Sequence, residues 1–164
     1  MRAILQRVSE ARVSVDGETV GEIGRGALVL LGVGHDDDLA VARSFAARIV
    51  GLRVFEDEQG RMNLSLADVG GEVLVVSQFT LWADCRSGRR PSFGRAAPGD
   101  RAEPLYLAFA DEVERLGLRT ARGRFGATMR VSLVNEGPVT IPIDTEGAFS
   151  APLRQPLAPD SGPR

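Results

Sequence analysis

Alternation of apolar and polar residues at the start of the chain predicts β-strands. The pattern runs through residues 3 to 8 and 11 to 15, and the Asp16-Gly17 pair that follows is typical of a two-residue hairpin turn. A strand within "ETVGEIG" would return from this turn. The next segment, "ALVLLGVG", is apolar almost throughout, which indicates a buried strand.

Two later segments change to the helical period. The first covers about residues 39 to 51, and the aspartates at 36 to 38 before it offer an N-cap. Its apolar positions fall on one helix face, at Ala42, Phe45, Ala46 and Ile49. The second helix begins at a capping-box pattern of Asp100 and Glu103 and ends at Gly117. Its apolar stripe consists of Leu105, Ala108, Phe109, Val113 and Leu116.

Short strands separated by loops account for the rest of the chain. They are expected at residues 52 to 56, 72 to 81, 118 to 121 and 129 to 144. Within the last of these, "VSLVNEGPVTIPID" alternates on both sides of Gly137-Pro138, so we expect a hairpin hinged at this dipeptide. Because only two helices accompany many strands, the predicted fold class is α+β, with an antiparallel or mixed sheet curled toward a barrel.

The 164 residues are most simply one domain, which we place at residues 1 to 145. The segment 146 to 164 is rich in proline and has no periodicity, so we expect a disordered tail. No stretch approaches the ~20 apolar residues of a membrane span, and the polar N-terminus is unlike a signal peptide. We therefore expect a cytoplasmic protein with no membrane contact. One histidine and one cysteine are too few for a Cys/His zinc site, and we expect neither metal nor cofactor.

Basic charge is concentrated in two segments of a chain that is acidic overall. Its 20 basic residues are all arginine and are outnumbered by 22 acidic residues. Residues 86 to 95 hold four arginines and residues 115 to 130 hold five, and neither segment contains an acid. Irregular basic segments of this kind are suited to gripping a phosphate backbone. Two solvated loops would have the same composition.

Chemistry is most plausible where the apolar strand "EVLVVSQFTL" turns polar, at Ser77, Gln78 and Thr80. Such a strand end can present hydroxyl, amide and backbone N–H groups to a ligand, or it can satisfy its own turn. A nucleophilic Ser77 or Thr80 would need a base, and the single histidine, His35, lies far away in sequence. A hydrolase built here would depend on backbone donors, a hydroxyl or the substrate itself.

Two sequence motifs and their flanking segments resemble those of the D-aminoacyl-tRNA deacylases. The likeness covers nearly all of residues 1 to 144, with Glu136 where Asp or Asn is commoner and Trp82 where Tyr is common. The motifs are "SQFTL" at 77 to 81 and "NEGPVT" at 135 to 140, flanked by "GRRPSF" at 88 to 93 and "GRFGATM" at 123 to 129.

The resemblance implies a homodimeric ester hydrolase that releases a D-amino acid from the 3′ end of tRNA and spares L-aminoacyl-tRNA. Glycyl-tRNA mischarged on tRNA(Ala) would also be a substrate. By the same resemblance, the Gly137-Pro138 peptide bond is cis and enters the partner subunit's active site as a chirality filter. A rigid backbone there would exclude an L side chain sterically and could not reject glycine.

Further roles follow from the resemblance. The opposite wall of the site would be Ser77, Gln78, Phe79 and Thr80, with backbone N–H groups near Gln78 and Phe79 polarising the ester carbonyl. Thr80 is either the nucleophile or a pocket residue beside a water that the tRNA's terminal 2′-OH assists, and the missing base favours the second. Arg7 would hold the Gly-Pro from within the fold. The other substrate-binding residues are Met129, Asn135 and Val139.

Aminoacyl-tRNA is thus the expected partner, with no role for DNA. Recognition would mainly involve the phosphate backbone and the single-stranded end. The expected tRNA contacts are Arg86, Arg89, Arg90, Arg122 and Arg124. Two alternatives remain open: a sibling deacylase with a trans Gly-Pro that acts on L-aminoacyl-tRNA, and a non-catalytic RNA-binding module that binds without turnover.

Overall fold

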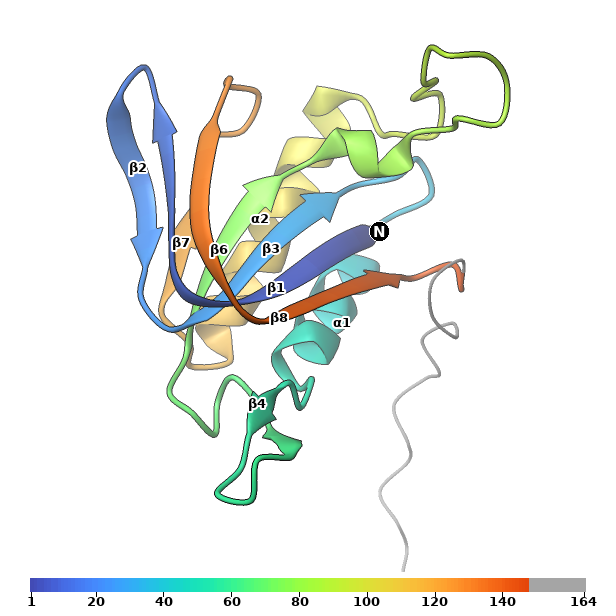
Figure 1. The fold of residues 1–164 in the computed structure, drawn as a ribbon. Coiled ribbons are helices and arrows are strands. Elements are labelled where there is room, and N and C mark those ends of the chain that lie inside the picture. Colours follow the sequence, from blue (N-terminus) through green and yellow to red (C-terminus); the bar gives the residue numbers. More distant parts are fainter. Residues whose placement is uncertain (148–164) are drawn as a thin grey trace, which may run out of the picture.

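The computed structural model describes residues 1–147, and within them the strands form two sheets (Figure 1). The strands are β1 (Arg2–Val15), β2 (Glu18–Ile23), β3 (Gly26–Gly32), β4 (Phe55–Glu56), β5 (Met62–Leu64), β6 (Glu72–Ser77), β7 (Thr120–Arg122) and β8 (Arg130–Asp144). The helices are α1 (Leu39–Val50), α2 (Gly99–Arg115) and the short 3-10 helix η1 (Phe79–Trp82). Neither α-helix of this part of the chain is both long and apolar enough to cross a membrane.

The main sheet is mixed and nearly closed, as the predicted fold class requires. Its order is β2-β1-β3-β6-β7, with β8 also paired to β1. The pairs of β1 are antiparallel, whereas β3 with β6 and β6 with β7 are parallel and are joined through α1 and α2. A Cβ on Gly21 of β2 would lie 2.6 Å from the carbonyl oxygen of Arg122 in β7, so the two ends of the sheet meet.

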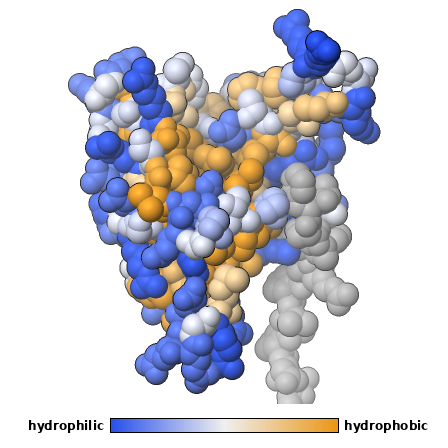
Figure 2. All heavy atoms as spheres, viewed as in Figure 1, coloured by the Kyte–Doolittle hydropathy of each residue, from blue (hydrophilic) through white to orange (hydrophobic). Residues whose placement is uncertain are grey.

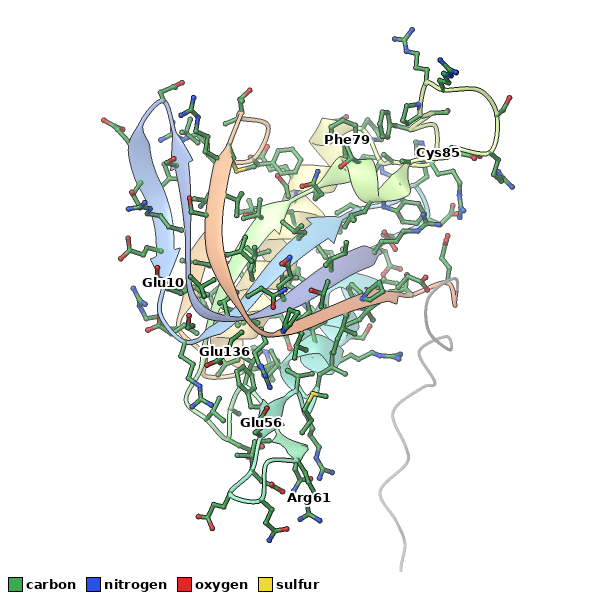
Figure 3. The ribbon with its side chains drawn as sticks, viewed as in Figure 1. Glu10, Glu56, Arg61, Phe79, Cys85 and Glu136 are labelled. Carbon is green, nitrogen blue, oxygen red and sulfur yellow. The ribbon has the colours of Figure 1, made fainter. Side chains whose placement is uncertain are left out.

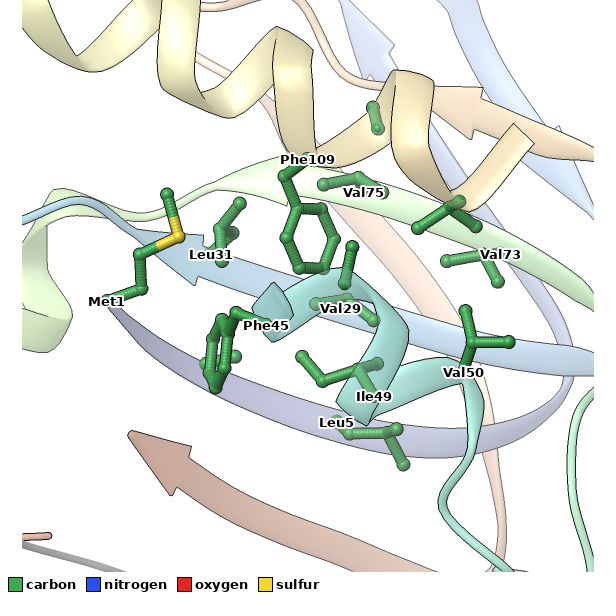
Figure 4. Close-up of a cluster of buried hydrophobic side chains, with 14 of the residues drawn as sticks. Met1, Leu5, Val29, Leu31, Phe45, Ile49, Val50, Val73, Val75 and Phe109 are labelled. Atoms are coloured by element: carbon green, nitrogen blue, oxygen red, sulfur yellow. The ribbon is translucent and has the colours of Figure 1, made fainter. Parts of the chain in front are cut away.

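The larger core lies between the two helices and one face of the sheet (Figures 1 and 4). The predicted α1 stripe is buried, and the Phe45 ring packs at 6.2 Å from the Phe109 ring of α2. A smaller core fills the inside of the curl, where Leu28, Leu74 and Val76 are buried together. The strands "ALVLLGVG" and "EVLVV" therefore need apolar residues on both faces, which explains their near-continuous apolar sequence.

Helix starts follow the predictions in one case only. The Asp38 carboxylate accepts from the Val41 N–H at 2.8 Å and caps α1 as expected. The capping box predicted for α2 is wrong, because this helix begins at Gly99 with Pro98 at the N-cap and no side-chain cap. The Pro98 carbonyl accepts from the Arg101 and Ala102 N–H groups, so Asp100 already lies in the first turn, where its charge favours the helix dipole.

Strand lengths differ from the predictions where pairing changes. The two strands predicted over 3 to 15 are one strand, β1, whose partner changes from β3 to β2 around the exposed residues Ser9 and Glu10. The strand predicted at 72 to 81 ends at Ser77, and the chain turns into η1. The loop predicted at 57 to 71 contains β5, which pairs with β4.

The hairpin predicted at Gly137-Pro138 is wrong. Residues 130 to 144 form a single strand, β8, that runs antiparallel to β1 on both sides of the dipeptide. Asn135 pairs with Val8 and Thr140 with Gln6, so the four residues 136–139 lie opposite Arg7 alone. Alternation resumes after such a bulge as it would in a second strand, which is why the sequence pattern suggested two strands.

The start of the predicted tail is attached to the domain. The Glu146 carboxylate pairs with Arg95 at 2.5 Å and with Arg2 at 3.5 Å, and these two guanidinium groups lie against the Trp82 ring. The rest of the tail expected to be disordered, residues 148–164, lies outside the described residues.

Candidate active site

A cavity of about 380 Å³ opens at the end of β6, where the sequence turns from apolar to polar. It is bounded by β6 and η1, by the first turn of α2 and by the segment that leads into β8. Among its lining residues, Ser77, Gln78, Phe79 and Met129 were predicted from the motifs. Sequence reasoning missed Leu31, Val33, Ala97, Gly99, Ala102, Tyr106, Phe125, Ala127 and Val131.

The turn after β6 determines which backbone donors face the cavity. The Gln78 N–H donates to the Leu31 carbonyl at 2.8 Å, so its predicted role as a donor to the ester carbonyl is wrong. At the start of a helix the first N–H groups have no intrahelical acceptor. Within residues 1–147, the Phe79 and Thr80 N–H groups have no hydrogen-bond partner, and these two donors remain available to a ligand.

Among the contacts described for residues 1–147, none brings a base to the Thr80 hydroxyl. Its Oγ1 accepts a hydrogen bond from the Gln78 side-chain amide Nε2, a group that cannot take up a proton. Over the described chain no cluster of three or more His, Cys, Asp or Glu residues is arranged as metal ligands would be. The chemistry supported here is therefore hydrogen-bond donation to a carbonyl oxygen rather than activation of the Thr80 hydroxyl.

Aromatic residues support the cavity from two sides. Tyr106 of α2 donates to the Val75 carbonyl at 2.8 Å, and burial raises the pKa of its hydroxyl to about 12, so it stays protonated. The Phe125 ring lies 5.7 Å from the Tyr106 ring. On the open side, Phe79 is 57% exposed and packs edge-on against Phe93 at 5.0 Å. The cavity thus has a fixed floor and an exposed aromatic rim.

The bulge in β8 is held from behind by Arg7 of β1. Arg7 is only 6% exposed, and its Nε donates to the Glu136 carbonyl at 3.0 Å, immediately before Gly137. Its Nη1 donates to the Val54 carbonyl at 2.8 Å, and Nη2 lies 3.5 Å from the Glu56 carboxylate. The sequence motif gave no sign of these two partners, which lie next to and within β4. The guanidinium therefore anchors the entering limb of the bulge to the domain.

The dipeptide itself is exposed on the outer side of β8. The Gly137-Pro138 peptide bond is cis, as the resemblance implies. Gly137 has a φ of +127°, and a Cβ there would lie 2.9 Å from both Arg7 Nη2 and Val139 Cγ2. Glycine is therefore required at this position by backbone conformation and by space.

Asn135 lies at the base of the bulge. Its Nδ2 donates to Thr140 Oγ1 at 2.9 Å, and its Oδ1 accepts from the Val139 N–H at 3.1 Å. The Val139 side chain packs against the larger core. Of the three remaining residues predicted to bind substrate, the structure places Met129 at the cavity and Asn135 and Val139 at the bulge.

The cavity and the bulge lie far apart in one chain. Figure 3 shows Phe79 near the top of the view and Glu136 well below it, above Glu56. Ser77 of β6 pairs with Leu31 of β3, which in turn pairs with Ala3 of β1. Ala3 lies four positions along β1 from Arg7, the residue opposite the bulge. With strands spaced ~4.8 Å and residues ~3.4 Å, the separation is roughly 14 Å across the sheet and roughly 14 Å along it. The two motifs cannot hold one amino acid within the same subunit.

The five arginines predicted to contact tRNA divide into two groups. Arg86 forms a bidentate pair with Asp84 that holds the pKa of this carboxyl well below its usual range. Arg122 Nη2 lies 2.8 Å from both Asp111 and Glu114. Arg89, Arg90 and Arg124 have no ion pair within residues 1–147, so their charges are the ones available to an anionic ligand.

Comparisons with known proteins agree with the two motifs. Proteins named D-aminoacyl-tRNA deacylase are 58% identical in Roseiflexus castenholzii, over 95% of this chain and 96% of that protein, and in Desulfatibacillum aliphaticivorans, over 89% and 100%. A solved structure of the c-Myc DNA Unwinding Element Binding Protein has a TM-score of 0.82 at 40% identity, covering 88% of this chain and 98% of that chain. A probable eukaryotic D-amino acid tRNA deacylase shares the fold, with a TM-score of 0.73 at 20% identity over 87% and 97% of the two chains. The family model for D-Tyr-tRNA(Tyr) deacylase matches residues 4–144, and the chain therefore belongs to this family.

Proposed function

We propose that this enzyme hydrolyses the ester that joins a D-amino acid, or glycine, to the 3′ end of tRNA, and that it rejects L-aminoacyl-tRNA. The observation that carries the proposal is the pair of N–H groups on Phe79, which lines the cavity, and on the adjacent Thr80, neither of which has a hydrogen-bond partner within residues 1–147. They are the donors that an ester carbonyl oxygen needs as it gains negative charge. Removing one such donor typically costs about 3–4 kcal/mol of barrier.

The reaction proceeds without a protein base in this proposal. Water adds to the ester carbonyl carbon while its oxygen accepts from the two N–H groups. The bond from the carbonyl carbon to O3′ of the terminal adenosine then breaks, O3′ takes one proton of the water, the other proton passes to solvent, and the free amino acid leaves as a carboxylate. The neighbouring 2′-OH of the tRNA relays the proton, because Thr80 Oγ1 is bonded to an amide that cannot accept one.

Two copies of the chain complete the site in this proposal. The outer edge of β8 has no strand partner among the described residues, although an unpaired edge of this length invites pairing or covering by another chain. Figure 2 shows apolar side chains gathered at the centre of the face on which β8 lies, and Val134 of β8 is 50% exposed. A homodimer would place the bulge of one subunit against the cavity of the other.

The chirality filter is then the backbone of Gly137-Pro138. Gly137 has no side chain and the Pro138 ring is closed onto the backbone, so the main chain of the dipeptide can approach the α-carbon of the bound amino acid closely. A side chain on the L face would overlap the backbone, whereas a D side chain points away from it and glycine has nothing to exclude. The tRNA end would be held through phosphate contacts to Arg89, Arg90 and Arg124.

The test of the activity is hydrolysis of D-Tyr-tRNA, L-Tyr-tRNA and Gly-tRNA by the purified protein. We expect turnover of the D-ester and of Gly-tRNA, with the L-ester at the buffer rate. Faster hydrolysis of the L-ester than of the D-ester would support the sibling deacylase instead. Binding of all three without turnover would support a non-catalytic RNA-binding module.

Subunit mixing tests the shared site. Phe79→Pro removes one cavity donor and Gly137→Ala displaces the bulge, and each variant alone should be nearly inactive. Random mixing of the two chains makes about half of the dimers mixed, and each mixed dimer has one intact site out of two. Recovery of about a quarter of wild-type activity is expected. If each site lies within one subunit, mixing restores nothing.

A further inference from the structure

We propose that Asn135 and Thr140 are positioning residues, which hold the Gly137-Pro138 bulge in the orientation that selects against L-aminoacyl esters. The proposal rests on the proposed function and assigns it a side-chain clamp. The clamp is made of two hydrogen bonds at one amide, which donates to the Thr140 hydroxyl and accepts from the Val139 N–H.

The clamp lies where the pairing between β8 and β1 is interrupted. On either side of the bulge, β8 is fixed by its pairing with β1, but the residues 136–139 face one residue and cannot all bond to it. The Glu136 carbonyl, on the entering limb, accepts from Arg7 at 3.0 Å. Pro138 has no N–H to donate, so the Val139 N–H is the first donor after the dipeptide, and it donates to Asn135.

The entering limb of the bulge, at Glu136, and the returning limb, at Val139, are therefore held by different side chains. Arg7 connects the entering limb to β1 and to Val54, whereas Asn135 connects the returning limb to the entering one. Without the Asn135 amide, the backbone after the dipeptide would be held only from Thr140 onward, where the pairing with β1 resumes. A backbone that excludes a side chain by overlap must be fixed at both ends, because a small displacement removes the overlap.

The position of the clamp argues for orientation rather than for general stability. Thr140 is exposed and Asn135 is partly exposed, and neither side chain belongs to the apolar cores. The asparagine amide carries a donor and an acceptor on the same carbon, so it can bond the Thr140 hydroxyl and the Val139 N–H at once. Both polar atoms of this amide thus have a partner inside its own strand.

The experiment measures the ratio of kcat/KM for D-Tyr-tRNA to that for L-Tyr-tRNA in a set of matched variants. Asn135→Ala removes both hydrogen bonds, and Thr140→Val removes one with little change in shape. We expect the D-to-L ratio to fall by about tenfold or more in Asn135→Ala and by less in Thr140→Val, mainly through faster L-ester hydrolysis. Thr140→Ser keeps the hydroxyl and should restore the wild-type ratio.

Two further measurements separate orientation from folding. Ser132→Ala, an exposed position on the same strand, should leave the ratio and the melting temperature unchanged. Hydrogen exchange at the Val139 amide should accelerate in Asn135→Ala while exchange in the paired parts of β8 does not. The double variant should lower the ratio no further than Asn135→Ala alone, because both substitutions remove the same hydrogen bond.

Three outcomes would overturn the proposal. If the wild-type enzyme selects the D-ester and the variants select it equally well, Asn135 and Thr140 have no role in selection, and the proposed function still stands. A parallel loss of D- and L-ester hydrolysis together with a lower melting temperature would make the clamp a matter of folding only. A wild-type enzyme without any preference for the D-ester would overturn the proposed function itself.

Discussion

The cavity and the bulge are built in opposite ways. The cavity is concave and lined by side chains from several elements, with an exposed aromatic rim at Phe79 and Phe93. The bulge presents the exposed residues Gly137 and Pro138, of which the first has no side chain and the second has a ring closed onto its own backbone nitrogen. The first region suits the binding of a varied ligand, and the second suits the exclusion of atoms from a fixed place. The proposed function thus assigns binding and selection to separate parts of the chain.

Their supports differ in the same way. Behind the cavity, Tyr106 donates to the carbonyl of a buried strand, and apolar packing does the rest. Behind the bulge, the supports are polar, with Arg7 beneath one limb and Asn135 across the base. Substitutions in the cavity should therefore change the rate for every substrate, and substitutions at the bulge should change the choice among substrates.

Phe79→Pro should give the largest effect. Phe79 is the first residue of η1, a position where proline is tolerated, so the change removes one N–H donor and leaves the turn intact. A loss of about 10²–10³-fold in kcat is expected for D-Tyr-tRNA and for Gly-tRNA alike. Phe79→Ala removes the ring and keeps the N–H, and it should lose far less. Equal losses in the two variants would show that the ring, and not the donor, carries the effect.

Gly137→Ala should give the second largest effect. It should lower the D-to-L selectivity as well as the rate. The added Cβ meets Arg7 and Val139 at 2.9 Å in a backbone conformation that L residues rarely adopt, so the bulge must move. A displacement of about 1 Å can cost 10²-fold in rate, and we expect a loss of this order for the D-ester with a smaller loss for the L-ester. Gly24→Ala is the matched control, because a Cβ at Gly24 meets nothing within 4 Å. An unchanged D-to-L ratio in Gly137→Ala would separate the bulge from selection.

Sequence alone predicted features that depend on residues close together in the chain, and it missed features that depend on contacts between distant segments. The α1 stripe and the hairpin at Asp16-Gly17 were predicted correctly because a single period or a single turn determines them. The bulge was mistaken for a hairpin because the alternation of apolar and polar residues does not show which strand lies opposite. The bulge becomes apparent only from the pairing of β8 with β1 on both sides of it.

The donors and the cavity lining show the same limit. The motif indicated the correct strand end, but the Gln78 N–H was assigned to substrate although the carbonyl of Leu31, on the neighbouring strand β3, accepts from it. Tyr106 and Phe125 come together only through the packing of α2 on the sheet. Small residues at Gly99 and Ala102, in the first turn of α2, were the one available signal that this turn leaves space for a cavity.

The two groups of arginines extend the comparison to tRNA. Replacing both Arg89 and Arg90 by alanine should weaken tRNA binding several-fold and lower the slope of log K against log salt by about 0.7 for each phosphate that is no longer neutralised. Arg86→Ala is the matched control in the same loop, because its charge is already neutralised by Asp84. Filter binding of uncharged tRNA at several salt concentrations measures both quantities. A larger effect for Arg86 than for the pair would contradict this division of the loop.

Thr80→Ala should have the smallest effect, and it decides how the cavity works. Alanine keeps the backbone N–H that we propose as a donor to the ester carbonyl and removes only a hydroxyl whose partner is the Gln78 amide. If the terminal 2′-OH of tRNA relays the proton, the single-turnover rate should change by less than about threefold, and a tRNA ending in 2′-deoxyadenosine should lose far more. If Thr80 is the nucleophile, the variant should instead lose many orders of magnitude, and the 2′-deoxy substrate should be cleaved at close to the normal rate. Because the two mechanisms predict opposite orders for these two changes, a comparison of the variant with the modified tRNA distinguishes them even if both rates fall.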